Sequence, residues 1–129
     1  MSQTLAHEIP VLDLTYKAEE VMATRYVAVM LGTGDDGVLL ATAEVATSIG
    51  ILQDTAAAIG DSVRVRVLGV SLVKANTTIS KGDKINSAAA TGKVAIATAN
   101  HKYLGEALRA ALAQNDEIPA LINPAWYAT

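Results

Sequence analysis

The sequence predicts a mainly β fold, a small aliphatic β-barrel or β-sandwich, for this chain of 129 residues. Three observations favour this class. Short stretches rich in Val and Ile, bounded by Gly, Asn or Ser, recur about every 8 to 12 residues, which is typical of all-β domains. The chain has no Phe, one Trp and four Tyr, so its core must consist of Val, Ile, Leu and Ala. Gly-Asp pairs at 60–61 and 82–83 indicate tight turns between strands.

The first 18 residues contain Pro10 and few periodic signals. We expect residues 1–18 to form an extended N-terminal arm, and a frayed chain end is the alternative. The apolar segment "IPVLDL" favours the arm, because frayed chain ends seldom carry such a segment.

Alternating residues predict the first strands of the domain. "ATRYVAVML" (23–31) and "VLLATA" (38–43) flank the glycine-rich "GTGDDG", and this pattern predicts a hairpin. "RVRV" within residues 63–67 indicates the clearest strand, with its valines on one face. Arg64 and Arg66 then lie on the other face, directed toward solvent or a partner.

The rest of the domain is predicted to contain short strands and a single helix. Further strands are expected at 69–75, 83–87 and 92–99. In "HKYLGEALRAALAQN" (101–115) the apolar residues fall at helical spacing, so we expect one short helix near residues 103–114. The resulting organisation is an arm at 1–18, a single β-barrel domain at 19–123 and a C-terminal tail at 124–129.

An offset of 55 residues superposes two parts of the sequence. Gly50 and Asp61 then match Gly105 and Asp116. Gly60 matches an asparagine, and these are the two residue types that most readily adopt the left-handed backbone conformation. The stretch from Gly69 to Asp83 repeats the pattern with a longer insert, which gives a third copy. A turn that is used three times indicates a structural element and argues against three catalytic sites.

The triplet Gly60-Asp61-Ser62 resembles the surroundings of some catalytic serines, but the partners of a nucleophile are missing. A serine nucleophile needs a histidine base, and the two histidines, His7 and His101, lie in the arm and in a polar turn. The serine also precedes a strand, so the strand-turn-helix of a nucleophile elbow is not formed. We therefore expect no enzymatic activity.

Composition excludes several other classes of function. The absence of Cys excludes disulfides, zinc–thiolate sites and thiol catalysis. His7-Glu8 and Asp35-Asp36 lack metal-ligand spacing, and "GTGDDG" is followed by a strand, not by the helix of a dinucleotide site. The net charge of −3 without a basic block argues against nucleic acid as a partner. We expect no cofactor, no metal, no membrane segment and no secretion signal.

One long stretch resembles a known family. "IGILQDTAAAIGDSVRVRVLGVSLVKANTTISKGDKINSAAATGKVAIA", followed by "YLGEAL", is similar to the capsid decoration (head cement) proteins of tailed bacteriophages. The shared order is "GILQ", a small-residue linker, "GDSVRVRVLGVS", a "GDKI"-like turn, a "TGK" turn and "LGEAL". The resemblance extends over roughly residues 15–123, and the arm and the tail lie outside it.

The resemblance implies a structural virion protein. Such a protein is made in the host cytoplasm, binds the outer surface of the capsid and stabilises contacts between neighbouring major capsid subunits. It also implies a homo-oligomer, with a trimer favoured. The arm is then a candidate strand for pairing with a capsid subunit or a neighbouring copy.

The candidate capsid or oligomer interface combines the apolar arm residues, the two outward arginines and the C-terminal aromatic pair. These residues are Ile9, Val11, Leu12, Leu14, Arg64, Arg66, Trp126 and Tyr127. A solvated strand face is the alternative for the arginines, and a plug on the end of the barrel is the alternative for the aromatic pair. The alternative function is a cellular, non-catalytic β-barrel assembly or carrier module, for which Lys81 and Lys93 are the only carrier lysines at hairpin tips.

Overall fold

A computed structural model describes residues 9–42, 48–88, 91–97 and 102–126. Within these ranges the regular elements are β-strands and no residue is helical, so none belongs to a helix that could span a membrane. The strands are β1 (Ile9–Ala18), β2 (Ala28–Leu31), β3 (Gly37–Leu40), β4 (Ser48–Leu52), β5 (Ser62–Lys74), β6 (Lys84–Ser87), β7 (Val94–Ile96), β8 (Lys102–Ala107) and β9 (Glu117–Trp126). The prediction of a mainly β fold is confirmed.

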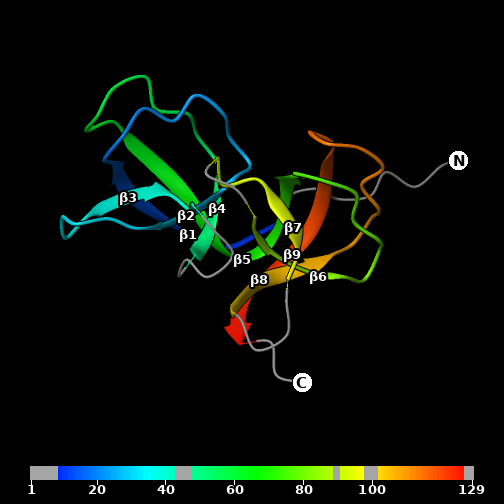
Figure 1. The fold of residues 1–129 in the computed structure, drawn as a ribbon. Coiled ribbons are helices and arrows are strands. Elements are labelled where there is room, and N and C mark those ends of the chain that lie inside the picture. The colour runs from blue at the N-terminus through cyan, green and yellow to red at the C-terminus, as the bar shows by residue number, and fades with distance from the viewer. Residues whose placement is uncertain (1–8, 43–47, 89–90, 98–101, 127–129) are drawn as a thin grey trace, which may run out of the picture.

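The nine strands form one sheet in the order β1-β3-β2-β4-β5-β9-β8-β6-β7, and β1 also pairs with β5. The pairings of the first five strands therefore run in a circuit. Two of its junctions consist of only two pairs each: the parallel one between β1 and β3, with Lys17↔Gly37 and Ala18↔Val38, and the antiparallel one between β4 and β5. Because these junctions are so short, a closed barrel is not confirmed. Figure 1 shows a molecule of two lobes that β5 joins.

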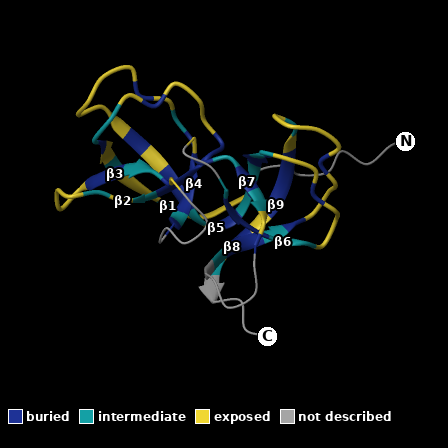
Figure 2. Cartoon of the chain, viewed as in Figure 1, coloured by how far each residue is buried: buried dark blue, intermediate teal, exposed yellow. Residues whose placement is uncertain are grey.

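β5 is the central strand of the molecule and belongs to both lobes. Its first half pairs with β1 and β4, and its second half pairs with β9. Val63 and Val65 point into the core of the first lobe, whereas Val73 points into the core of the second. Both cores consist almost entirely of aliphatic side chains, and Figure 2 shows the buried residues inside each lobe and the exposed ones on the turns.

The 55-residue offset of the sequence recurs in the pairing of the backbone. The pairs Ile51↔Arg66 and Leu52↔Val65 join β4 to β5. The pairs at the same offset, Glu106↔Leu121 and Ala107↔Ala120, join β8 to β9 in the same register. The two halves of the chain are therefore built on one pairing scheme.

Smaller elements follow the same scheme. The isolated bridge between Met22 and Ala56 in the first lobe has its counterpart between Ile79 and Ala111 in the second. The hairpin of β2 and β3 has its counterpart in β6 and β7, because Leu31↔Val38 becomes Ser87↔Val94 at an offset of 56. The structure thus contains two equivalent units that share β5. The stretch from 69 to 83 is not a third unit, although the predicted turn forms at its end, where Gly82 has a φ of 91° and the carboxylate of Asp83 accepts the N–H of Ser80.

The predicted helix near residues 103–114 is wrong. Residues 102–107 form β8, which pairs with β9 and β6, and residues 108–116 form a loop. The spacing of the leucines misled the prediction, since Leu104 is buried in the core whereas Leu108 and Leu112 are exposed. Gly105 fits a strand here because a Cβ atom at this position would collide with the carbonyl oxygen of Leu121.

An N-terminal arm that is separate from the domain is not confirmed. Residues 9–18 form β1, which pairs with β5 from Ile9↔Val70 to Lys17↔Ser62. The first eight residues of the predicted arm lie outside the described residues.

Candidate functional site

The predicted interface residues of β1 lie beside β5 and contribute to an apolar surface. The pairs Ile9↔Val70 and Leu12↔Leu68 join β1 to β5, and Val70↔Leu121 joins β5 to β9. Directly paired residues project from the same face of a sheet, so these five side chains lie together. We call this surface, made of Ile9, Leu12, Leu68, Val70 and Leu121, the apolar face.

The apolar face is open to solvent. The large side chains at its border and centre, Ile9, Leu12, Leu68 and Leu121, are each between 37% and 47% exposed. Val11 lies in an irregular stretch of β1 and is 70% exposed. Leu14 pairs with the buried Val65 and is 36% exposed.

The charges that border the apolar face are paired within the chain. Glu106 of β8 pairs directly with Leu121 of β9. Its carboxylate lies 4.0 Å from the ammonium group of Lys84. Lys74 and Glu117 form another cross-strand pair with an N–O distance of 3.2 Å. The surroundings of the apolar face are therefore close to electrically neutral, which favours an uncharged partner surface.

Arg66 does not lie on the exposed surface that the sequence predicted. It projects away from the valines, as expected, but only 6% of its side chain is exposed. Its guanidinium group forms a bidentate ion pair with Asp13, at 2.9 and 3.1 Å, and also donates to the carbonyl oxygen of Val70 at 3.0 Å. Its role is to hold β1 on β5.

Arg64 is exposed and forms a second ion pair. Its guanidinium group donates to the carboxylate of Asp54 at 2.9 and 3.1 Å, and its backbone N–H donates to the same carboxylate at 3.0 Å. These hydrogen bonds lower the pKa of Asp54 below its ordinary value. More than half of the Arg64 side chain remains accessible to a partner.

The outer edge of β1 carries backbone groups without a strand partner in the described ranges. The N–H of Lys17 donates to the carbonyl oxygen of Asp36 on the side away from β5. Because backbone groups alternate along a strand, Thr15 and Asp13 direct their N–H and C=O groups to the same side. The register places no residue of the described chain beside them.

The C-terminal aromatic pair is only partly described. Trp126 is the last residue of β9, and its backbone pairs with that of Lys102 in β8. Tyr127 lies outside the described residues.

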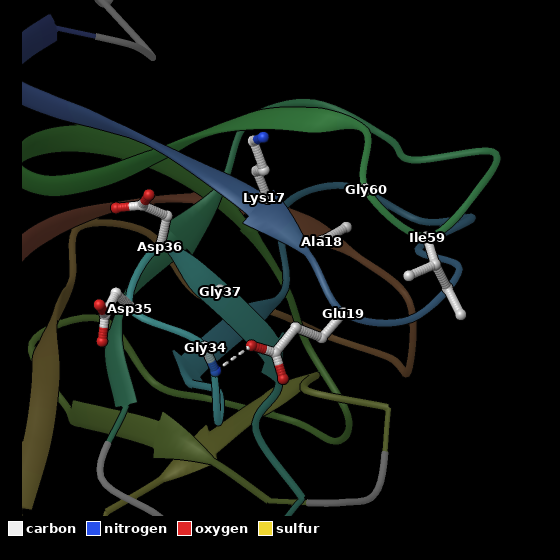
Figure 3. Close-up of a pocket in the computed structure, with 9 residues that line it drawn as sticks. All are labelled: Lys17, Ala18, Glu19, Gly34, Asp35, Asp36, Gly37, Ile59 and Gly60. Carbon is white, nitrogen blue, oxygen red and sulfur yellow. Dashed lines mark hydrogen bonds between the residues drawn. The ribbon is translucent and has the colours of Figure 1, made fainter.

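A shallow depression of about 350 Å³ lies beside the β2–β3 hairpin (Figure 3). Its central group is the carboxylate of Glu19, which accepts hydrogen bonds from the N–H groups of Thr33 and Gly34 at 3.0 and 2.7 Å. These bonds lower the pKa of Glu19. Asp35 and Asp36 point away from Glu19 (Figure 3), and no acidic or histidine cluster suited to a metal occurs among the described residues. The depression is best explained as the packing of the hairpin on Glu19.

The triplet Gly60-Asp61-Ser62 forms a turn. Gly60 has a φ of 96°, and the carboxylate of Asp61 accepts hydrogen bonds from the N–H groups of Ala57 and Ala58 at 3.0 and 3.1 Å. Ser62 is the first residue of β5 and pairs with Lys17. Both histidines of the chain lie outside the described residues.

Sequence reasoning missed three residues of this region: Asp13, Leu68 and Leu121. The alternation of 63–67 could not place Leu68, because a register shift between Leu12 and Asp13 interrupts the pairing of β1 with β5 at this point. Nothing local indicated Asp13 or Leu121, because the pairing that joins them to β5 spans more than 50 residues.

A comparison with protein families adds an independent finding. The family described as phage cement protein matches residues 6–122 of the chain. This span includes β1 to β8 and most of β9, and thus the whole apolar face. No curated protein matches the chain.

Proposed function

Because the chain belongs to the phage cement protein family, we propose that it binds the outer surface of a phage capsid and stabilises the contacts between major capsid subunits. Phage cement proteins are structural and capsid-associated, not enzymatic. The chain is accordingly a structural protein of the capsid. The proposal concerns its surface of attachment, its partner and its assembly.

The observation that carries the proposal is the apolar face. Five aliphatic side chains from three adjacent strands form one exposed surface, and the ion pairs beside it leave little net charge. Contiguous exposed apolar surface of this kind marks protein–protein contacts. A paired sheet also holds these side chains in fixed positions, so that little conformational entropy is lost on binding.

The remaining predicted interface residues are proposed as further contacts. Val11 and the accessible part of Arg64 are proposed to contact the capsid or a neighbouring copy at the rim, whereas Arg66 is buried and is no longer proposed as a contact. Leu14, Trp126 and Tyr127 stay candidates for contacts between copies. We further propose a homo-oligomer, with a trimer favoured, that is made in the host cytoplasm and attached to the outside of the virion.

The test is binding of the purified protein to expanded phage heads that lack it. Deletion of residues 1–14 is unsuitable, because it removes Asp13 and most of β1 and so damages the fold itself. The variants Leu12→Asp and Leu121→Asp place charge on the apolar face and should each weaken binding at least tenfold. Leu31→Asp, at an exposed position of β2, is the matched control and should bind as the unmodified protein does. Equal binding by all variants would refute the assignment of the apolar face.

The oligomeric state is tested separately. Light scattering measures the mass of the unmodified protein and of Leu121→Asp. The unmodified protein should have the mass of a trimer if the copies associate before they bind the capsid. A monomer in both samples would contradict assembly in solution and would leave the capsid as the place where copies meet.

A further inference from the structure

The two equivalent units each present the same turn at their surface. In the first unit the turn covers residues 56–61, and in the second it covers residues 111–116. Each begins with a buried alanine, Ala56 or Ala111, which forms an isolated bridge to the body of its lobe. In each, the aspartate at the end accepts two backbone N–H groups of the same turn.

The backbone of the two turns is also the same. Gly60 and Asn115 both have positive φ, 96° and 74°. The N–H of Gly60 donates to the carbonyl oxygen of Ala18 at 2.8 Å, and the N–H of Asn115 donates to that of Ala75 at 2.7 Å. Both turns are therefore held in one defined conformation by their own hydrogen bonds and by a bond to the last residue of β1 or to the residue that follows β5.

Each turn exposes one large aliphatic side chain. Leu112 is 82% exposed and Ile59 is 72% exposed, which are the highest values among the large apolar side chains that the structure describes. An aliphatic side chain at such a position contributes little to folding, because it remains in contact with water. A rigid turn that displays one is suited to insertion into a pocket of a partner.

The internal repeat shows that the fold does not require these side chains. At the offset of 55, the counterpart of Ile59 is Gln114 and the counterpart of Leu112 is Ala57. The same turn therefore forms with a polar or a small residue at either position. What the two turns share is one exposed aliphatic side chain each, although at different positions.

The two turns lie on different lobes. In Figure 1 the green loop before β5 belongs to the first lobe and the orange loop before β9 belongs to the second, and both lie on the upper side of the view. Figure 2 shows both loops as exposed. One molecule thus presents two turns of the same kind, one on each of the two units that share β5.

We propose that Ile59 and Leu112 are a pair of anchors by which one molecule binds two neighbouring, identical capsid subunits. Each anchor would enter an apolar pocket of one subunit. Two copies of one structural element in a single chain match two copies of one partner site, which a shell of repeated subunits provides. This inference rests on the proposed function and names the part of the chain that would join the two subunits.

The two anchors should act together. When two contacts are linked in one molecule, the second forms as an intramolecular event, so the loss of either weakens binding and the loss of both weakens it far more. Removing one aliphatic side chain that is buried in a capsid pocket should lower the affinity for the capsid about tenfold to a hundredfold. Each molecule should also bind across two subunits and not within one.

The test exchanges the residues between the two units. Ile59→Gln and Leu112→Ala each introduce the residue that the equivalent turn already carries, so folding is preserved. Leu31→Ser is the matched control, since Ser87 is the counterpart of the exposed Leu31 in the hairpin of the second unit. The measurement is the binding isotherm of each variant on expanded phage heads that lack the protein, with thermal unfolding as a check of folding.

We expect weaker binding from each single variant, a larger loss from the double variant and no change from Leu31→Ser. If the unmodified protein binds heads and the double variant binds equally well, the inference is overturned. It is also overturned if one single variant loses all binding and the other loses none, because that result indicates a single contact. Failure of the unmodified protein to bind heads would instead refute the proposed function.

Discussion

The carboxylate of Asp13 in β1 and the guanidinium group of Arg66 in β5 form a bidentate ion pair across 53 residues of sequence. Only 6% of the Arg66 side chain and 18% of the Asp13 side chain are exposed. A buried charge is costly unless a partner of opposite charge is held beside it. The pair therefore fixes β1 on β5 at the point where the two lobes meet.

Asp13→Ala should destabilise the protein strongly. Removing one partner of a buried ion pair costs about 3–5 kcal/mol, because the charge that remains has lost its main compensation. Denaturant unfolding of the variant measures this loss. Asp54→Ala is the control, because its pair with Arg64 is largely exposed and should contribute less than about 1 kcal/mol. Equal losses in the two variants would contradict the structural role of Asp13.

Gly105→Ala should be far more harmful than Gly60→Ala. A Cβ atom on Gly105 would collide with the carbonyl oxygen of Leu121 in the neighbouring strand. This collision is relieved only if β8 and β9 move apart. We expect the free energy of unfolding to fall by about 3 kcal/mol, which is at the upper end of the range for overpacked sites. Gly60 has open space around it, so an alanine there should cost only the strain of positive φ, about 1–2 kcal/mol.

The equivalent position in the other unit provides a second measurement. A Cβ atom on Gly50 would meet the carbonyl oxygen of Arg66, which is the counterpart of Leu121. Gly50→Ala should therefore resemble Gly105→Ala in its effect on the free energy of unfolding. A mild effect at either position would show that the strand with the glycine and its neighbour can move apart without loss of stability.

Local patterns in the sequence were sufficient for most of the central strands and for two copies of the repeat. The valines between 63 and 67 alternate because one side of β5 faces a core, and the matched glycines at 50 and 105 are both required by a close carbonyl oxygen. Such constraints act within one strand or one turn, so they leave a direct trace in the sequence. The same holds for the family, because its motifs are these turns and strands.

Long-range pairing left no comparable trace. The alternation placed Arg66 correctly on the side opposite the valines, but only the pairing of β1 with β5 brings its partner Asp13 beside it. The spacing of three leucines is helical, yet Leu104 lies in a strand and packs in the hydrophobic core. Leu108 and Leu112 are exposed in a loop. Spacing alone does not reveal which apolar residues are buried, and for this reason the helix was predicted and the apolar face was missed.

Asp61→Ala and Asp116→Ala should have similar effects on stability. Each aspartate accepts two backbone N–H groups in equivalent turns, and the loss of such a side-chain acceptor costs about 1 kcal/mol. The residues lie in different lobes, so the losses should add in the double variant to within about 0.5 kcal/mol. Chemical denaturation of the three variants measures this. A strongly non-additive result would contradict two independent turns.

The hairpin between β2 and β3 should respond to acid through Glu19. Hydrogen bonds from the N–H groups of Thr33 and Gly34 stabilise the ionised carboxylate and hold its pKa below the ordinary value of 4.5. A carboxylate with a lowered pKa in the folded state contributes stability that is fully present above the unfolded pKa. This contribution is lost as the pH falls from 4.5 through the lower pKa of the folded state.

The amide chemical shifts of Thr33 and Gly34 report this titration directly. Between pH 6 and pH 2.5 both signals should move together, with one midpoint below 4.5, as the carboxylate of Glu19 takes up a proton and the two hydrogen bonds weaken. In Glu19→Gln the same amides should show no such step, because the side chain does not titrate. If both amides titrate in this variant as they do in the unmodified protein, another acidic group controls the hairpin, and Glu19 does not hold it in place.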